Sequence, residues 1–303
     1  MKKFKKVMLI YGGISSEREI SIISSTEIAK SLIRLGYEII KIDANKYLKN
    51  EIEKYMPDVI FNALHGTWGE DGEVQKIIEE AKVPYTNSGI DASNLAMDKH
   101  RSSIEFIKNS IPYPKTYLSS MKDFKKNNMI NYPFVIKPRN EGSSVGVAIV
   151  YSNKDKEIYI KENYERLDIL IQEFIEGVEI QVAIIGHEKT GSIEIVPKNQ
   201  FYDYESKYFD DGKTQHIIPP RLTKNEIEKV EQLGLKAHKI LKCKGISRSD
   251  FIMNKKTNTF YILEVNTQPG MTPTSLVPEI ALSKGIDFDC LIDWILNDAS
   301  TNR

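Results

Sequence analysis

The sequence predicts an α/β protein in which a parallel sheet comes first and antiparallel strands come later. Over about the first 90 residues, short apolar runs alternate with longer amphipathic runs, as in a parallel sheet covered by helices on both faces. From Ile180 the apolar residues alternate singly with other residues, which is typical of antiparallel strands. A prior of ~150 residues per domain suggests about two domains, but the changes of pattern fit three units better: 1–93, 94–180 and 181–303.

The first unit is predicted to be a sheet whose strands end in polar, glycine-containing loops. Its first helix is expected to begin with an S-x-x-E capping box, Ser16 and Glu19. The apolar residues of that helix recur at helical spacing: Ile20, Ile23, Ala29, Leu32 and Ile33. The other expected elements are strands Val7–Tyr11, Glu38–Ile42, Asp58–Leu64 and Val83–Tyr85, and helix Glu73–Ala81. Because sites in such sheets lie at the carboxyl ends of strands, the loops Gly12–Glu17 and His65–Gly72 are candidates.

The rest of the chain is predicted to contain a helical stretch, two short strands, and then a sheet with a long loop and a helix. The polar segment Phe201–His216 has no period and is interpreted as a long loop, a common form of active-site lid. The expected helices are Asp91–Ser110 and Lys224–Leu241. The expected strands are Phe134–Pro138, Ile169–Phe174, one beginning at Ile180, Ile193–Val196, Asp250–Met253 and Thr259–Val265.

Composition excludes several classes of protein. The chain has 42 Lys+Arg and 42 Asp+Glu, a formal net charge of zero, so it lacks the basic footprint of a nucleic-acid-binding protein. Its two cysteines, Cys243 and Cys290, cannot form a disulfide framework and favour a reducing compartment. The basic N-terminus precedes only a short apolar run, Val7–Tyr11, without a cleavage site, and no segment is long enough to span a membrane. We therefore expect a soluble, cytoplasmic protein.

Two carboxylates and an amide are predicted to meet on a β-hairpin near the C-terminus. Pairing around the turn Asn254–Asn258 sets Asp250 opposite Glu264 to within about one residue, and Asn266 lies on the same face as Glu264. Like charges opposite each other destabilise a sheet unless something neutralises them. An all-oxygen set without Cys or His suits Mg²⁺ or Mn²⁺. The alternative is a solvent-exposed hairpin with charged ends.

Three cations are candidates for binding phosphate. Lys137 ends an apolar strand directly before the loop Gly142–Gly146, and backbone N–H groups in such loops bind phosphates while a nearby Lys adds a point charge. The loop is neither a Walker A nor a G-x-G-x-x-G sequence and could be a plain turn. Lys99 lies in a predicted helix, where a surface charge is the simpler interpretation. Arg248 precedes Asp250 and would lie beside the metal.

The segment Gln172–Ile175 could present its backbone to an adenine ring. Glu179, which follows it, could accept hydrogen bonds from ribose hydroxyls. In isolation, Glu179 would more simply be an exposed residue on an alternating strand.

Taken together, these residues resemble the ATP-grasp superfamily and, much more closely, the D-alanine–D-alanine ligases. The resemblance covers nearly the whole chain, in order. Its N-terminal motifs are Gly12-Gly13 with Ser16–Glu19, Ala63–Gly66 with Gly69–Gly72, and Pro84–Gly89. The later motifs are Met97–Lys99, Val135–Pro138, Glu141–Gly146, Phe201–Tyr208, Leu263–Thr267 and Pro269–Thr272. The resemblance implies a three-domain ATP-grasp fold in which the central and C-terminal domains enclose ATP.

For the nucleotide, the resemblance implies contacts to phosphates, adenine, ribose and metal ions. The Gly142–Gly146 loop would close over the phosphates, and two Mg²⁺ or Mn²⁺ ions would bridge the β- and γ-phosphates. The implied phosphate-binding residues are Lys99, Lys137 and Ser144, the adenine and ribose residues are Gln172, Glu173, Ile175 and Glu179, and the metal ligands are Asp250, Glu264 and Asn266.

For the amino acids, the resemblance implies ligation of two D-alanines through a D-alanyl phosphate, with release of ADP and phosphate. Glu17 would pair with the ammonium of the first D-alanine and form a hydrogen-bonded chain with Ser143 and Tyr208. Arg248 and the backbone N–H of Gly270 would stabilise the oxyanion of the second step.

The second D-alanine is implied to bind through its carboxylate to Lys207 and Ser275. His65 would lie near the substrates, either in proton transfer or in a structural role. Tyr208 argues for D-alanine as the acceptor, because relatives that make D-alanyl-D-lactate lack Tyr in this loop. Gln172, Gln268 and Thr274 depart from the family pattern; at Gln172, where many relatives have Glu, only nucleotide affinity is affected.

Three other functions compete with this interpretation. Another ATP-grasp ligase or carboxylase would leave Glu17 and Tyr208 unexplained. A non-catalytic nucleotide-binding protein would be expected to lack at least one of the charged residues named above, and all are present. A D-alanyl-D-lactate or D-alanyl-D-serine ligase would share the nucleotide residues and differ at the acceptor. The resemblance also implies a homodimer and a role in peptidoglycan precursor synthesis.

Overall fold

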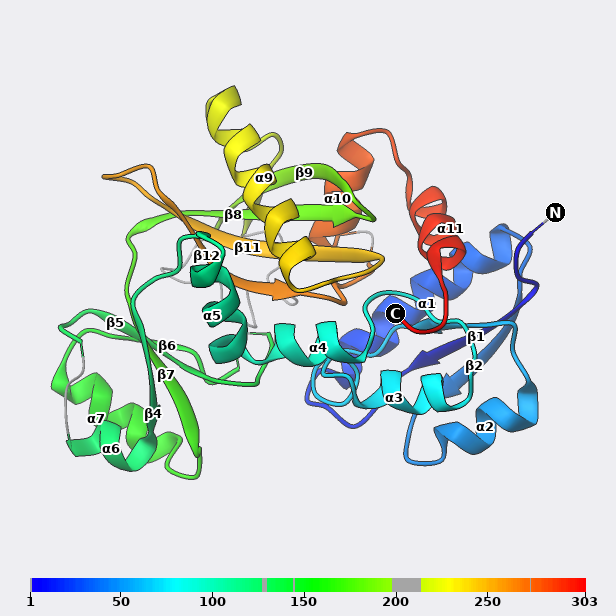
Figure 1. The fold of residues 1–303 in the computed structure, drawn as a ribbon, viewed down its shortest axis with the longest axis horizontal. Coiled ribbons are helices and arrows are strands. Elements are labelled where there is room, and N and C mark those ends of the chain that lie inside the picture. The colour runs from blue at the N-terminus through cyan, green and yellow to red at the C-terminus, as the bar shows by residue number, and fades with distance from the viewer. Residues whose placement is uncertain (1, 127–129, 144, 198–213, 273) are drawn as a thin grey trace.

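A computed structural model of the chain describes residues 2–126, 130–143, 145–197, 214–272 and 274–303. It contains one parallel and two antiparallel sheets, each with its own helices (Figure 1). The parallel sheet is formed by the N-terminal part of the chain, as the sequence predicts. The predicted α/β class is therefore confirmed.

The N-terminal sheet has the strand order β2-β1-β3, with β1 at Lys6–Tyr11, β2 at Glu38–Asp43 and β3 at Val59–Asn62. Alternate residues of β1 point to opposite faces. Val7 and Leu9 share a core with helix α1 (Arg18–Arg34). Met8 and Ile10 instead pack with α2 (Leu48–Tyr55) and α3 (Glu73–Glu80). Both faces are covered, which explains why the whole strand is apolar.

Three details of this unit differ from the sequence predictions. Helix α1 has Glu17 at its N-cap without a side-chain capping bond, so the Ser16–Glu19 capping box is wrong; the Glu17 N–H instead donates to Ser15 Oγ at 3.1 Å. Helix α2 has no counterpart in the prediction. Instead of a strand at Val83–Tyr85 there is a single bridge position, Tyr85, between Ile60 and Ser300.

The helical stretch expected over Asp91–Ser110 is two helices, α4 (Ile90–Met97) and α5 (Lys99–Lys108). The break is at Asp98, whose backbone is extended and whose carboxylate accepts the N–H groups of the first turn of α5. Arg139 holds the same carboxylate with N···O distances of 3.0 and 2.7 Å. This arrangement places Lys99 at the start of α5, where it is buried.

The central sheet is antiparallel with the order β4-β7-β5-β6. Its strands are β4 (Thr116–Ser120), β5 (Phe134–Pro138), β6 (Ala148–Val150) and β7 (Asp168–Glu173). Helices α6 (Met121–Lys126) and α7 (Asn153–Glu162) pack on one face, over Phe134 and Ile136. The two-residue period of β5 therefore sends Val135 and Lys137 to the opposite face.

The third sheet is antiparallel with the order β10-β9-β8-β11-β12. Its strands are β8 (Gly177–Ile185), β9 (Glu188–Val196), β10 (Gln215–Ile217), β11 (Ile246–Asn254) and β12 (Phe260–Asn266). Helix α9 (Lys224–Ile240), which begins with a Thr223–Glu226 capping box, packs against it through Val230 and Ala237. The predicted β8–β9 pairing and the β11–β12 hairpin are both present.

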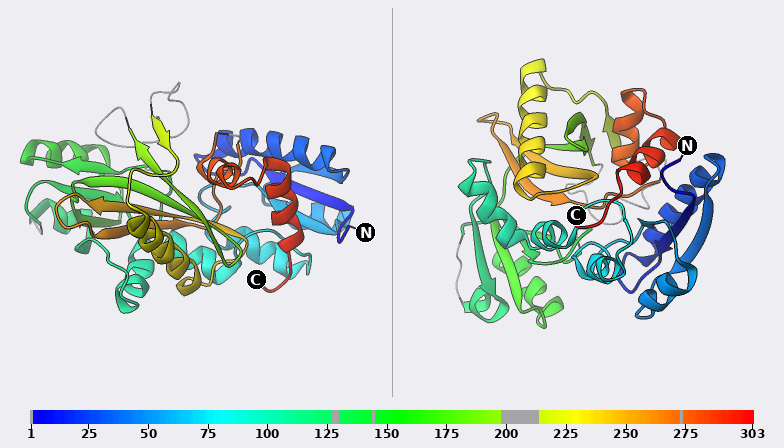
Figure 2. Two further views of the ribbon diagram at one scale, coloured as in Figure 1. Left: turned by 90° about the horizontal axis from the view of Figure 1, so that it is seen from above. Right: turned by 45° about the vertical axis from the view of Figure 1, so that its right-hand side comes forward.

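The last two helices, α10 (Leu276–Ser283) and α11 (Phe288–Asp298), return to the N-terminal unit. Figure 2 shows α11 (red) beside α1 (blue). Arg34 of α1 pairs with Asp289 at 2.5 Å, and the Tyr37 hydroxyl donates to Asp293 at 2.7 Å. One apolar core joins α1, α10, α11 and β9, so the N-terminal and C-terminal units are packed together.

No helix within the described ranges is both long and apolar enough to cross a membrane. The two cysteines are free thiols, with Cys243 buried and Cys290 exposed.

Candidate active site

Two pockets meet beside the β11–β12 hairpin. The smaller, of about 200 Å³, lies between the N-terminal loops and the segment after β12. The larger, of about 650 Å³, lies between the central and C-terminal sheets and is in the size range of small-molecule and cofactor sites. Lys99 and Glu264 line both pockets. A group bound in one pocket can therefore reach a group bound in the other at these two residues.

The hairpin has the predicted register, with Asp250 paired to Glu264 and Arg248 paired to Asn266. A bulge between Asp250 and Phe251 shifts the register by one residue on the turn side. Asp250 is only 6 % exposed, so the solvent-exposed alternative is wrong. The Arg248 guanidinium donates two hydrogen bonds to the Asp250 carboxylate, at 2.7 and 2.9 Å. Lys99 Nζ lies 3.4 Å from the carboxylate of Glu264 on the partner strand. These cations neutralise the two facing carboxylates.

The oxygen atoms of this hairpin fit a hard divalent cation. Asp250 and Glu264 supply carboxylates, and Asn266 supplies an amide oxygen that already accepts the Gln268 N–H at 2.7 Å. Mg²⁺ is commonly held by one or two carboxylates together with substrate phosphates. In the described ranges no three His, Cys, Asp or Glu side chains gather as a closed protein cage. The hairpin is thus suited to a cation that arrives with a phosphorylated ligand.

Lys99 and Lys137 bring two buried ammonium groups to the junction of the pockets. Burial and the positive charge of Lys99 lower the pKa of Lys137 to about 8, against the opposing effect of the Glu264 carboxylate. Lys99 also donates to the Glu141 carbonyl. The surface interpretation of Lys99 is wrong, because the helix break at Asp98 turns this residue inward. Two buried cations at one point form a site for an anion such as a phosphate.

The glycine loop after β5 reaches across to the N-terminal unit. The Ser143 hydroxyl donates to the Glu17 carboxylate, and Ser143 has a positive φ of 48°. A Cβ at Gly142 would lie 3.0 Å from Glu17 Oε1, and one at Gly66 would lie 2.9 Å from the same atom. The two glycines therefore allow both loops to approach this carboxylate closely. Ser144 lies outside the described residues.

The far end of the larger pocket is suited to a nucleoside. The segment Gln172–Ile175 and Glu179 line it, as the sequence predicts. Gln172 is buried, and its Nε2 donates to Thr116 Oγ1 at 2.9 Å, which fixes the orientation of the amide. Ile175 is buried and Glu173 is exposed. Apolar and polar groups are therefore mixed here, as in pockets that bind a ring and its hydroxyls.

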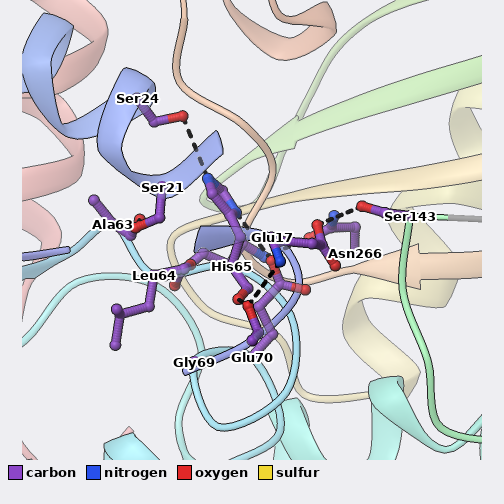
Figure 3. Close-up of polar contacts among 12 residues, drawn as sticks. Glu17, Ser21, Ser24, Ala63, Leu64, His65, Gly69, Glu70, Ser143 and Asn266 are labelled. Atoms are coloured by element: carbon purple, nitrogen blue, oxygen red, sulfur yellow. Dashed lines mark hydrogen bonds and ion pairs between the residues drawn. The ribbon is translucent and has the colours of Figure 1, made fainter. Parts of the chain in front are cut away.

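The smaller pocket ends in a buried cluster of ionisable groups around His65 (Figure 3). His65 Nδ1 lies 3.0 Å from Glu70 Oε1, and its Nε2 lies 3.3 Å from Ser24 Oγ. Burial lowers the pKa of His65, but the Glu70 and Glu17 carboxylates outweigh it and raise the pKa overall. Glu17 is 5 % exposed and lines the pocket. A buried carboxylate facing a small cavity is suited to an ammonium group.

The opposite wall of the smaller pocket is the segment from Gly270 to Ser275. Ser275 Oγ accepts the Thr272 N–H at 3.0 Å and lies 2.8 Å from Thr272 Oγ1. The predicted residues Lys207 and Tyr208 lie outside the described part of the chain.

Sequence reasoning missed several residues that the structure places in the two pockets. Glu70 lies in a predicted loop, but no sequence pattern connects it with His65, and Thr272 enters the sequence analysis only through the motif Pro269–Thr272. Gln181, which lines the larger pocket, was not singled out. Its two-residue spacing from Glu179 on one strand would have placed both on one face.

Comparisons with known proteins agree with this arrangement. Residues 113–297 match the family model described as the D-ala D-ala ligase C-terminus, and residues 44–88 match the D-ala D-ala ligase N-terminus. The chain is 50% identical to the D-alanine–D-alanine ligase of Pelagibacter ubique over 99% of both chains. It is 43% identical to that of the Drosophila simulans Wolbachia, over 98% of this chain and 94% of the relative.

The chain is also similar in fold to solved structures of ligases. The chain is 32% identical to the D-alanine–D-alanine ligase from Bacillus anthracis complexed with ATP, with a TM-score of 0.81 over 98% of this chain and 97% of the other. It is 25% identical to the VanG D-Ala:D-Ser ligase from Enterococcus faecalis, with a TM-score of 0.80 over 97% and 98%.

Proposed function

The chain belongs to the D-alanine–D-alanine ligase family, and we infer that it is an ATP-dependent D-alanine–D-alanine ligase whose reaction takes place where the two pockets meet. The observation that carries this inference is that Lys99 and Glu264 line both pockets. ATP in the larger pocket and a D-alanine carboxylate in the smaller one would react at this junction.

In the first step, a carboxylate oxygen of the first D-alanine attacks the γ-phosphorus of ATP. The bond from that phosphorus to the bridging oxygen breaks, ADP leaves and D-alanyl phosphate forms. Lys99 and Lys137 neutralise charge on the phosphates, which is the main requirement of phosphoryl transfer. Glu17 orients the amino acid by pairing with its ammonium, and Ser143 holds Glu17.

In the second step, the amine of the second D-alanine attacks the carbonyl carbon of D-alanyl phosphate. An oxyanion forms, the bond to the phosphate oxygen breaks, and an amine proton is lost to solvent. Arg248 and the Gly270 N–H stabilise the oxyanion. Asp250 binds Nε and Nη2 of Arg248, which fixes the plane of the guanidinium group. Ser275 and Lys207 would hold the acceptor carboxylate, and Tyr208 would favour an amine acceptor.

The roles of the nucleotide-binding residues are assigned from the family resemblance. Lys99, Lys137 and Ser144 contact the phosphates, Gln172, Glu173 and Ile175 contact adenine, and Glu179 contacts ribose. Two Mg²⁺ or Mn²⁺ ions held by Asp250, Glu264 and Asn266 would supply further positive charge against the phosphates. The all-oxygen donor set supports this assignment.

The domains, the oligomeric state and the cellular location of the protein are also proposed. The three proposed domains, 1–93, 94–180 and 181–303, divide substrate binding, ATP binding and metal binding between them. A homodimer formed through the N-terminal domain rests on resemblance. A cytoplasmic location fits the use of ATP and the two free thiols. The dipeptide product would enter peptidoglycan precursors.

We predict that the purified protein releases phosphate from Mg·ATP in the presence of D-alanine alone. Added D-lactate or D-serine should not increase the rate, and mass spectrometry should detect D-alanyl-D-alanine as the product. L-Alanine is the matched control and should give the background rate. Phosphate release only after addition of D-lactate or D-serine would contradict the proposed acceptor, and background release with all four would contradict the ligase function.

A further inference from the structure

Gln181, on strand β8, carries a buried oxygen in the larger pocket that has no hydrogen-bond donor in the part of the chain that the structure describes. The residue is 3 % exposed, and its Oε1 has no partner within the described ranges of the chain. Gln172, which lines the same pocket from the central sheet, instead has its amide held by Thr116. A buried carbonyl oxygen without a donor is unfavourable, so such an atom in a ligand pocket indicates a donor supplied by the ligand.

The sheet register places Gln181 beside the hairpin that carries the carboxylates. Gln181 pairs with Asp250, whereas Glu179 pairs with Ile252. Ile252 lies two residues closer than Asp250 to the turn between β11 and β12. Directly paired residues of neighbouring strands have their side chains on the same face and within contact distance. Gln181 therefore lies nearer to the proposed metal position than does Glu179, the residue assigned to ribose.

The chemistry of a hydrated divalent cation matches the unpaired oxygen. Mg²⁺ bound through one or two carboxylates keeps several of its waters, and a water on a cation is a strong hydrogen-bond donor. The adjacent Asp250 carboxylate forms an ion pair with the Arg248 guanidinium, with an N···O distance of 2.7 Å.

We propose that Gln181 is a binding residue for the metal–nucleotide complex, in which its amide oxygen accepts a hydrogen bond from a water on the cation held by Asp250 and Glu264. This inference rests on the proposed metal site. If Gln181 contacts a water on the cation, replacing it should change the affinity for the metal-bound nucleotide and not the affinity for the metal-free nucleotide.

Calorimetric titration with ADP, with excess Mg²⁺ and with EDTA, tests this assignment without turnover. In Q181L we expect the affinity for Mg·ADP to fall about tenfold, since a hydrogen bond to a charged group is lost, while metal-free ADP binds within twofold of wild type. Q181E keeps an acceptor oxygen and should retain the tightening by Mg²⁺. Q172L, altered on the central-sheet side of the same pocket, should lose affinity equally with and without metal. Melting temperatures verify that each variant is folded.

Equal weakening of Q181L with Mg²⁺ and with EDTA would overturn the proposal in favour of a nucleoside contact, and no weakening would overturn it altogether. A wild-type protein whose ADP affinity does not respond to Mg²⁺ would overturn the metal assignment together with this one. The ligase function is judged separately, by D-alanine-dependent phosphate release.

Discussion

Replacing Glu264 by Gln is expected to reduce kcat by about 10³-fold while leaving the protein folded. Glu264 lines both pockets, forms an ion pair with Lys99 and lies close enough to Lys137 to oppose the lowering of that lysine's pKa by burial. The change keeps the size of the side chain and removes one of the two carboxylates proposed to hold the metal. Glu264 is proposed to hold a cation against the phosphates, and the loss of one fixed group that supports the stabilisation of transition-state charge costs about 10²–10³-fold in kcat.

Steady-state phosphate release measures this effect, with circular dichroism and a melting curve to verify the fold. The matched control is E176Q, which alters an exposed carboxylate in the wall of the larger pocket and should keep kcat within a few-fold of wild type. Retention of normal turnover by E264Q would show that the hairpin carboxylates do not act on the phosphates.

Replacing Glu17 by Gln should raise the KM for the first D-alanine by about 100-fold and leave ATP affinity nearly unchanged. Glu17 is buried, lines only the smaller pocket and accepts from Ser143. The variant retains the shape and an acceptor oxygen but would leave the ammonium of D-alanine without its proposed counter-charge. Removing one partner of a buried charge pair costs 2–5 kcal/mol or more, and about 2.7 kcal/mol corresponds to 100-fold.

Initial rates at varied D-alanine, together with calorimetric ADP binding, separate the two effects. E19Q, on the same helix but exposed, serves as the control and should behave as wild type. A large loss of nucleotide affinity in E17Q, with an unchanged KM for D-alanine, would assign this carboxylate to the wrong substrate.

The hairpin shows how far local sequence rules can position a site. The turn at 254–258 and the two-residue period of the strands are enough to pair Asp250 with Glu264, and the bulge changes the register only on the turn side. Lys137 follows in the same way, because the alternation of β5 sends Phe134 and Ile136 into the core and Lys137 to the other face.

Residues that depend on distant partners could not be placed from the sequence. Lys99 is turned inward by a helix break at Asp98, and Asp98 is held by Arg139, 41 residues further along the chain. The contact between Ser143 and Glu17 spans 126 residues and exists only because two units pack together. The family resemblance implies Lys99 as a phosphate-binding residue and implies the contact between Ser143 and Glu17, but it does not give the Asp98–Arg139 pair that turns Lys99 inward. Lys207 and Tyr208 stay predictions from resemblance.

The isotopic fate of the D-alanine carboxylate tests the proposed acyl phosphate most directly. The protein would be incubated with Mg·ATP and D-alanine labelled with ¹⁸O in both carboxylate oxygens, and the released phosphate would be analysed by mass spectrometry. Attack of the carboxylate on the γ-phosphorus, followed by attack of the amine on carbon, transfers one ¹⁸O atom to each phosphate. The acyl-phosphate route predicts singly labelled phosphate in a one-to-one ratio with dipeptide. Unlabelled phosphate would contradict it.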